Sequence, residues 1–256
     1  MNQPRIEHEL GVPIPGEILD PALWTQTALK AMPATGNLNW AELFGRIAPV
    51  VIDLGCGNGR FLLGSAVARP DYNHLGIDIL PVVIRYARRR GNQRGLTNIR
   101  FAVGGGRQLL NEFVEPGSVD EIHCYHPQPY YERAEVHRRL ITPEFLALVH
   151  RSLKANGLFV IQTDNPGYWK YIQKIVPIFF DFVEMKTPWP DTPQGRTRRE
   201  IIARQRGLPV FRGYGRRRDD ISADAAMKIA ETLPPPVFDA NRHLRALDRM
   251  ERGSDK

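Results

Sequence analysis

The chain has 256 residues, which is long enough for one large domain with appendages. Its hydrophobic content of 42% and charged content of 25% are typical of a globular protein, and no apolar run approaches membrane-spanning length, which argues against a membrane protein. The formal net charge of +7 favours polyanionic partners such as nucleic acid. Cys56 and Cys124 follow no metal-ligand spacing, so we expect free thiols, no metal site and a cytoplasmic location.

Along the chain, residues 1–37 are rich in proline and glycine and predict an irregular N-terminal arm. A regular pattern occupies residues 38–212. We expect strands over 50–54, 74–78, 98–103, 119–125 and 157–164, and helices over 60–69, 81–94 and 145–153. This alternation predicts an α/β fold with a doubly wound, mostly parallel, Rossmann-like sheet. Residues 213–256 are expected to form a partly disordered C-terminal tail with one short helical stretch.

The first of these strands leads into a glycine loop. The strand carries one acidic residue, Asp53, near its end. The loop that follows has glycine at every second position, namely Gly55, Gly57 and Gly59. A dinucleotide fingerprint requires glycine where this chain has Arg60, and a carboxylate ahead of the loop would repel a pyrophosphate. The same carboxylate would attract an amino group, so the loop favours S-adenosylmethionine, which carries an ammonium and a sulfonium. A glycine turn without a ligand is the alternative.

Further unusual residues fall at other strand ends, where ligands of parallel sheets bind. Asp78 ends the second strand and can accept both ribose hydroxyls of a nucleoside, or else cap the helix that starts at Pro81. Gly105 lies in a run of three glycines after the third strand and can offer only backbone atoms and room; a turn without a ligand role is equally open. These positions predict a nucleoside site at one edge of the sheet.

The fourth strand is followed by His126-Pro127-Gln128-Pro129-Tyr130. The two prolines restrict the backbone and hold the Gln128 side chain at the sheet edge, although a rigid turn without a chemical role is the alternative. The turn differs from the Asp/Asn-Pro-Pro-aromatic turn of exocyclic-amine methyltransferases, which argues against that substrate class.

Several segments together resemble bacterial tRNA (guanine-N7)-methyltransferases over residues 38–212. They are Trp40–Gly45, Gly76–Asp78, the Pro-x-Pro-aromatic turn, His137–Leu140, Thr163–Asn165 and Thr197-x-x-Glu200. The resemblance implies a methyltransferase domain in which S-adenosylmethionine is held by Asp53, Gly55, Gly57 and Asp78, together with Gly105 and Gln128. The family has aspartate at the positions of Gly105 and Gln128, so these two are departures.

The resemblance also implies the residues that contact substrate. Asp164 and the Thr197/Glu200 pair would face the guanine, and Glu132, Arg138 and Arg139 would lie against the tRNA. Guanine N7 needs no deprotonation, and its methylation leaves a cationic base, so alignment and nearby negative charge are the useful contributions. We therefore expect Gln128 and Asp164 to be catalytic, with Asp164 the more critical.

The function predicted in this way is methyl transfer from S-adenosylmethionine to N7 of a guanine in tRNA, in the variable loop by resemblance. A silent RNA-binding homologue and a methyltransferase with a small-molecule substrate are the alternatives. Arginines gather around Thr197 and along residues 85–94, where either RNA contacts or a solvated face is expected. Monomer and homodimer stay open.

Overall fold

Every residue of β3 (Val50–Leu54), the strand that leads into the glycine loop, is buried. The structure is a computed structural model and describes residues 4–246. The chain divides into two compact units, residues 1–123 and 124–256, and the division falls inside β6 (Val119–Tyr125).

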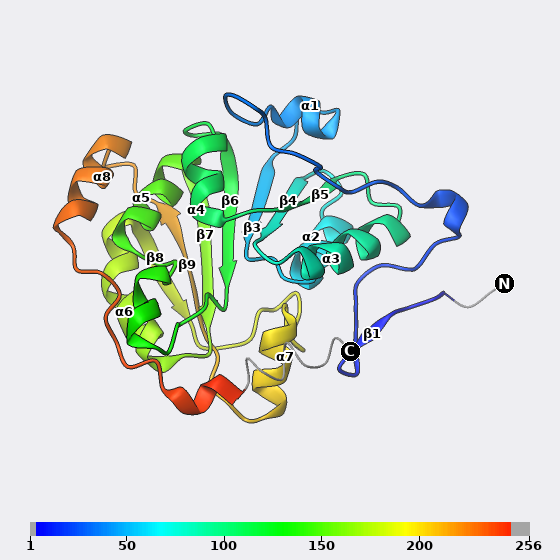
Figure 1. The fold of residues 1–256 in the computed structure, drawn as a ribbon. Helices are drawn as coiled ribbons and strands as arrows, with labels where there is room; N and C mark the ends of the chain where they lie inside the picture. The colour runs from blue at the N-terminus through cyan, green and yellow to red at the C-terminus, as the bar shows by residue number, and fades with distance from the viewer. Residues whose placement is uncertain (1–3, 247–256) are drawn as a thin grey trace. The chain divides into compact units, whose positions relative to one another are not determined.

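The first unit contains parallel strands in the order β5-β4-β3-β6, where β4 is Asn73–Asp78 and β5 is Ile99–Val103 (Figure 1). Asp53 of β3 is in register with Gly76, and Asp78 of β4 is in register with Val103. Because the strands are parallel and in register, the acids and the loops that follow them meet at one edge of the sheet.

Two connections in this unit are expected helices, and the helical segment after β5 was not predicted. α2 (Arg60–Ala68) starts directly after the glycine loop, and α3 (Pro81–Gln93) starts with proline in its first turn and buries Ile84 and Ala87. After β5, a short helical segment combines α4 (Gly106–Gln108) with the π-helical turn η2 (Leu109–Phe113). A helix after each of the strands β3, β4 and β5 confirms the doubly wound class.

The N-terminal arm has little regular structure. Its short elements are β1 (His8–Glu9), β2 (Val12–Pro13), the 3-10 turn η1 (Pro21–Leu23) and α1 (Trp40–Phe44), which belongs to the segment after residue 38. Farther along the arm, Ala28 forms a parallel bridge with Phe101 of β5. The Phe101 N–H donates to the Thr27 carbonyl at 2.8 Å, and the Leu29 N–H donates to the Phe101 carbonyl at 2.9 Å. The arm therefore runs beside β5 as an extra extended segment.

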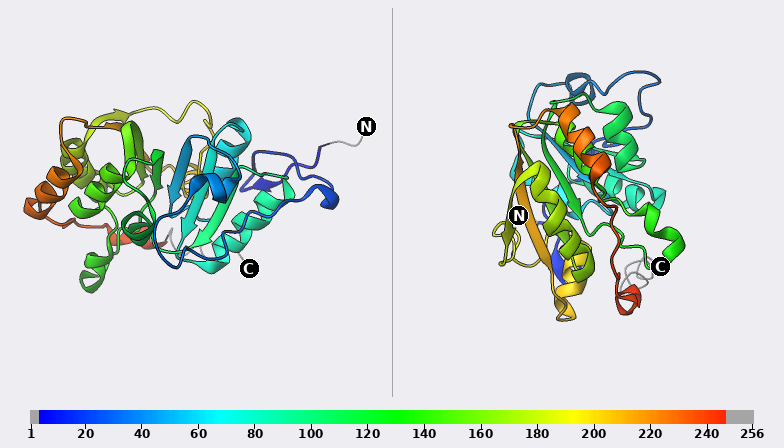
Figure 2. Two further views of the ribbon diagram at one scale, coloured as in Figure 1. Left: turned by 90° about the horizontal axis from the view of Figure 1, so that it is seen from above. Right: turned by 90° about the vertical axis from the view of Figure 1, so that its left-hand side faces the viewer.

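The second unit combines three strands with several helices. Its elements are η3 (Arg133–Arg138), α5 (Pro143–Ser152), β7 (Leu153–Thr163), α6 (Pro166–Phe179), β8 (Phe180–Met185), α7 (Arg198–Gln205), β9 (Phe211–Arg217), α8 (Ala223–Thr232) and η4 (Arg242–Leu244). β9 lies between β7 and β8 and is antiparallel to both. α8 lies alongside α5 (Figure 2).

β9 shows where the pattern of the sequence misled. A C-terminal tail was expected to start at residue 213, but this boundary falls inside the strand β9. A Cβ on Gly213 would lie 2.4 Å from the Phe182 ring, and one on Gly215 would lie 2.8 Å from Phe180 Cβ. Glycine here makes room for phenylalanines of β8. The end of the expected tail, 247–256, lies outside the described residues.

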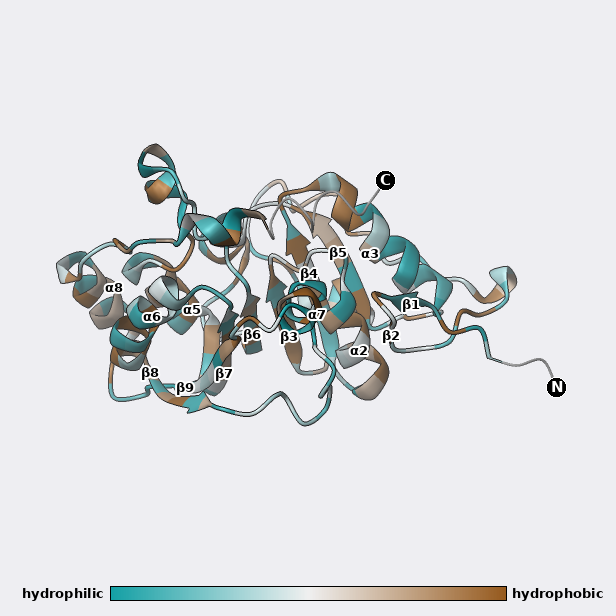
Figure 3. Ribbon diagram, turned by 90° about the horizontal axis from the view of Figure 1, so that it is seen from below, coloured by the Kyte–Doolittle hydropathy of each residue, from teal (hydrophilic) through white to brown (hydrophobic). Residues whose placement is uncertain are grey.

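Hydropathy varies sharply between neighbouring elements. Hydrophilic residues line much of α3, whereas the strands behind it carry the buried hydrophobic residues (Figure 3). Among residues 4–246, no helix is both long and apolar enough to cross a membrane.

Candidate functional site

Asp53, near the end of β3 in the first unit, is a buried carboxylate with an unsatisfied oxygen. The residue is 2% exposed, and within residues 4–246 its Oδ1 atom has no hydrogen-bond partner. Burial and the nearby Asp78 carboxylate raise the pKa of Asp53 well above its ordinary value. Because an uncompensated buried carboxylate is costly, the position suits a cationic ligand.

The glycine loop beyond Asp53 leaves space on one side. The Gly55 and Cys56 N–H groups donate to the Ile77 carbonyl at 2.8 and 3.0 Å, which fixes the loop to β4. Gly55 and Gly57 have φ angles of +77° and +53°, and no atom lies within 4 Å of where a Cβ of either would be. A ligand can therefore approach the backbone closely at both glycines. At Gly59, in contrast, a Cβ would lie 3.0 Å from Ala87 and Phe101, so this third glycine serves packing.

Asp78 braces the same loop. Its Oδ2 accepts a hydrogen bond from the Gly57 N–H at 3.0 Å, and its Oδ1 accepts one from the Leu80 N–H at 2.9 Å. Burial raises the pKa of Asp78, although these backbone hydrogen bonds act in the opposite direction. The structure thus brings Asp78 to the glycine loop, and each of its oxygens keeps a lone pair for a further donor. The N-cap of α3 is Leu80, which makes no side-chain capping hydrogen bond, so Asp78 does not cap this helix.

Exposed apolar side chains stand beside Asp78, and sequence reasoning did not single them out. Ile79 is 60% exposed and Leu80 47%, directly after β4, while Val103 at the end of β5 is 48% exposed. A Cβ on Gly105 would meet nothing closer than Gln108 Cβ at 3.9 Å. This edge offers an apolar surface and room, which suits a flat nucleobase. The available signal was Ile79-Leu80 immediately after the ribose acid.

Glu9 of the N-terminal arm ties the arm to the far side of the loop. Its Oε1 accepts from Asn58 Nδ2 at 2.7 Å and from Arg90 at 3.3 Å, and Arg60 lies 3.7 Å from its other oxygen. Arg90 also donates to the Asn58 carbonyl at 3.4 Å. Arg94 pairs with Glu7 at 3.2 Å. Two arginines of the expected basic helix face are therefore committed to the arm.

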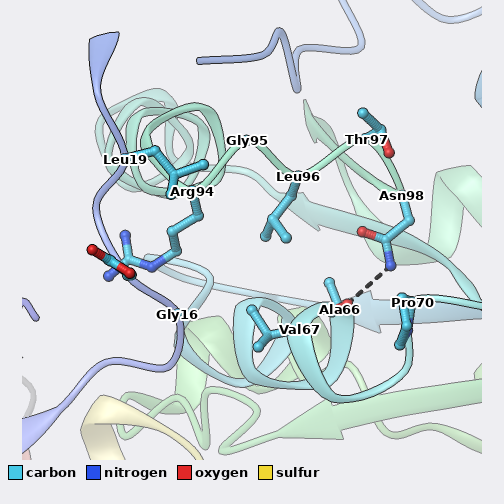
Figure 4. A pocket seen from close by; sticks show the side chains of 11 residues that line it. Gly16, Leu19, Ala66, Val67, Pro70, Arg94, Gly95, Leu96, Thr97 and Asn98 are labelled. Atoms are coloured by element: carbon cyan, nitrogen blue, oxygen red, sulfur yellow. Dashed lines mark hydrogen bonds between the residues drawn. The ribbon is translucent and has the colours of Figure 1, made fainter. Parts of the chain in front are cut away.

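A shallow pocket in the first unit lies elsewhere (Figure 4). It is lined by Leu19, Val67, Arg94 and Leu96, and by Asn98, which immediately precedes β5. Because Asn98 stands at the start of a parallel strand, this pocket is at the opposite end of the strands from Asp53. It is not the predicted nucleoside site.

In the second unit, Asp164 follows β7 and is 5% exposed. Its Oδ2 accepts from Arg199 Nε at 2.8 Å, and its Oδ1 lies 3.4 Å from His126 Nδ1. Burial opposes ionisation, but the hydrogen bond with His126 and the ion pair with Arg199 outweigh it and hold the pKa of Asp164 well below its usual range. Asp164 is therefore an ionised carboxylate with a partner on each oxygen.

Gln162, two residues before Asp164, is fully buried and was missed by sequence reasoning. Its Nε2 faces His126 Nε2 at 2.9 Å and donates to Glu200 at 3.1 Å. Its Oε1 accepts from Trp189 Nε1 at 2.7 Å and from Arg212 Nε at 3.2 Å. A glutamine within an apolar strand was the available signal. We name Gln162, His126, Asp164, Arg199, Glu200 and Arg212 the buried polar cluster.

The Thr197/Glu200 pair builds the start of α7. The Thr197 hydroxyl accepts from the Glu200 N–H at 3.1 Å, as an N-cap does. Glu200 itself is fully buried, pairs with Arg212 at 2.9 Å and accepts from the Arg196 N–H at 2.9 Å. The implied contact of Glu200 with guanine is not what this conformation presents, because its carboxylate is used by the buried polar cluster.

Arg138 and Arg139 were both expected to face tRNA, but the first is exposed and the second is buried. Arg139 is 2% exposed and donates to the Pro129 and Tyr130 carbonyls at 2.6 and 3.0 Å, which clamps the turn that carries Gln128. The implied RNA contact of Arg139 is therefore corrected to a structural one. Arg138 is exposed and lies over the Tyr130 ring at 4.9 Å.

The remaining predicted positions of this turn region lie at the surface. Gln128 is exposed, between residues His126 and Tyr130 that have φ angles of +49° and +42°. Such angles are uncommon for residues other than glycine and are found at functional turns. Glu132 pairs with Arg245 at 2.8 Å.

Comparison with known proteins gives consistent findings. Residues 47–212 match the family described as "Putative methyltransferase". The chain is 32% identical to the tRNA (guanine-N(7)-)-methyltransferase of Nitrosococcus oceani over 189 residues, which is 74% of this chain and 79% of that protein. It is 31% identical to the protein of the same name from Saccharophagus degradans and 34% identical to that from Thermus thermophilus.

The extent of these matches differs. They cover 62% of the Saccharophagus degradans protein and 42% of the Thermus thermophilus protein, so the chain spans less than two thirds of the length of these relatives. Among solved structures, the 16S rRNA methyltransferase KamB is similar with a TM-score of 0.52 at 14% identity, over 75% of this chain and 98% of that one. This likeness confirms the Rossmann-like methyltransferase fold class.

Proposed function

The chain belongs to the tRNA (guanine-N7-)-methyltransferase family, and from this premise we propose that it transfers a methyl group from S-adenosylmethionine to N7 of a guanine in tRNA. The observation that carries the proposal is the unsatisfied, buried Oδ1 atom of Asp53 beside an open glycine loop. A carboxylate oxygen without a partner can pair with the ammonium of such a nucleoside, and the open loop leaves room for the rest of it. A tRNA substrate would place the reaction in the cytoplasm.

The residues of the first unit fit this methyl donor. Asp53 would pair with its ammonium, and the open backbone at Gly55 and Gly57 would lie against its methionine part. Asp78 would accept the ribose hydroxyls while it braces the loop. The space at Gly105 and the exposed apolar residues beside it would take the adenine. When bound, S-adenosylmethionine supplies an electrophilic methyl group on a sulfonium.

The residues of the second unit have other tasks in the proposal. Guanine N7 carries a lone pair and needs no base, but the base gains positive charge when it is methylated. The ionised carboxylate of Asp164 can stabilise that charge. The exposed Gln128 can orient the base through its amide oxygen, and Thr197 with Glu200 would hold the start of α7 in place. Arg138 and Glu132 would contact the tRNA, with the variable loop as the methylated region.

The proposal is tested with the full chain, radiolabelled S-adenosylmethionine and unmodified tRNA transcripts, followed by nucleoside mapping. We expect 7-methylguanosine at one position, and no product from a transcript in which the variable-loop guanine is replaced by adenine. Calorimetry with S-adenosylmethionine alone is the companion measurement. Absence of both binding and product would favour a silent RNA-binding homologue and overturn the proposal.

A further inference from the structure

The buried amide of Gln162 can adopt only one orientation. Two of its neighbours, Trp189 Nε1 and Arg212 Nε, carry hydrogen and have no acceptor atom, so they require the amide oxygen. Glu200 Oε2, on the other side, is a carboxylate oxygen and requires the amide nitrogen. All the hydrogen-bonding capacity of the amide is then satisfied, and a flipped amide would oppose three of its neighbours.

This orientation decides the protonation of His126. The Gln162 nitrogen points an N–H at His126 Nε2 over 2.9 Å, so Nε2 must be an acceptor without hydrogen. In a neutral imidazole the other nitrogen then carries the proton. That nitrogen, Nδ1, lies 3.4 Å from Asp164 Oδ1 and is its donor. The cluster therefore selects the Nδ1–H tautomer of His126.

The charges around His126 are balanced without it. Asp164 pairs with Arg199, and Glu200 pairs with Arg212, across elements α7, β7 and β9. Asp164 and Gln162 contact the imidazole, while Arg199 pairs with Asp164, and Glu200 pairs with Arg212 and accepts from Gln162. The cluster therefore needs no positive charge from His126. The neutral imidazole instead orients the Asp164 carboxylate through its Nδ1–H group.

His126 is also connected to the turn through its backbone. The His126 N–H donates to the Gln162 carbonyl at 2.7 Å. His126 has a φ angle of +49° and directly precedes the turn Pro127-Gln128-Pro129. One residue is therefore hydrogen-bonded to the carboxylate of Asp164 and adjacent to the turn that presents Gln128. Displacing the imidazole would affect both groups.

We propose that His126 is a positioning residue for methyl transfer: as the Nδ1–H tautomer imposed by Gln162, it holds Asp164 Oδ1 while Arg199 holds Oδ2, so that the carboxylate is fixed in one orientation. The proposal rests on the proposed function, since it concerns the charge that would face the methylated guanine. The structure supports a role in orientation and not in proton transfer, because guanine N7 has no proton to lose.

The first test is spectroscopic and needs no activity. In the wild-type chain, ¹⁵N-¹H correlation of the imidazoles, with the His126 signals assigned by their loss in His126→Asn, is expected to show Nδ1 protonated and Nε2 unprotonated. Proton on Nε2 in the folded protein would overturn the proposal whatever the enzyme does.

The second test compares three variants in the methyl-transfer assay. His126→Phe keeps a flat ring but removes the donor, and kcat is expected to fall roughly 10- to 100-fold with little change in the KM for S-adenosylmethionine, because misalignment of a reacting group costs about that much. His126→Asn can place an amide N–H near the Nδ1 position and should recover most of kcat, whereas His126→Gln should recover less.

The double variant His126→Phe/Asp164→Asn should be no slower than Asp164→Asn alone, since both act through one carboxylate. Thermal unfolding is recorded for every variant. A lower melting temperature with unchanged kcat in His126→Phe would make the role purely structural and overturn the proposal. Absence of methyl transfer in the wild type, with the Nδ1–H signal present, would instead reject the proposed function and leave the tautomer established.

Discussion

Asp53 and Asp164 are both buried acids at the ends of strands, one in each unit, but their surroundings are opposite. Asp53 has an oxygen without a hydrogen-bond partner among residues 4–246, while Asp164 has a partner on each oxygen. Burial raises the pKa of Asp53, whereas His126 and Arg199 outweigh burial and lower that of Asp164. The unpaired oxygen of Asp53 suits a cationic ligand, whereas the Asp164 carboxylate is held in place by its own neighbours.

The largest expected effect tests the framework in the second unit. Glu200→Gln removes the charge from a fully buried partner of Arg212 and is expected to lower the free energy of unfolding by about 3–5 kcal/mol, because Arg212 is left without its counter-charge. Urea unfolding measures the change. Glu231→Gln on the exposed face of α8 is the matched control and should change it by less than about 0.5 kcal/mol.

The opposite result is expected for Asp53→Asn in the first unit. Affinity for S-adenosylmethionine should fall roughly 10- to 100-fold, because a charge-assisted hydrogen bond is lost, while the melting temperature stays level or rises. Calorimetry measures the affinity for S-adenosylmethionine, and thermal unfolding measures the melting temperature. Asp71→Asn, at an exposed position, is the control for both. If Asp53→Asn lowered stability as Glu200→Gln does, the contrast between the two units would fail.

Two neighbouring arginines sharpen the contrast within the second unit. Arg139→Lys loses the planar set of donors that clamps the turn and should cost about 1–3 kcal/mol of stability. Arg138→Ala should leave stability nearly unchanged but weaken tRNA binding, with a shallower dependence on salt. Denaturant unfolding measures the stability of both variants, and filter binding at several salt concentrations measures their affinity for tRNA. If the salt dependence of tRNA binding were unchanged in Arg138→Ala, Arg138 would not contact the RNA.

The smallest effect is the pH dependence of stability in the absence of ligand. The folded protein keeps a proton on Asp53 at pH values where the unfolded chain has lost it, so this residue makes stability fall as pH rises through that window. Asp164 has the opposite effect, because its pKa is lowered in the folded protein. It stabilises the folded protein at pH values above the ordinary carboxyl pKa, and this stabilisation is lost as the pH falls. The wild-type curve minus that of Asp53→Asn should therefore slope downward above about pH 4.

The parts that could be predicted from the sequence are local. Strand, acid, glycines and helix follow one another between residues 50 and 68, so these elements were predicted from adjacent residues. The position of Asp78 at the end of β4 was predicted in the same way. The helix α5 begins at Pro143, two residues before the expected start, because Thr142 caps it.

The buried polar cluster could not be predicted, because its members are distant in the sequence. His126 meets Asp164 across 38 residues, and Gln162 meets Arg212 across 50. Local pattern shows which residues are polar but not which of them neutralise one another. The family resemblance placed Arg139 against tRNA and Glu200 against guanine, whereas in this structure both side chains bond within the protein.

One feature of the arm bears on how the protein can be handled. The segment 27–29 lies against β5, the last strand in the order of its unit, and hydrogen-bonds with Phe101 on both sides. It thereby covers a sheet edge that would otherwise offer its backbone to another chain. A shortened chain that starts after residue 30 should self-associate on its own β5. We therefore expect the arm to protect this edge against association with other chains.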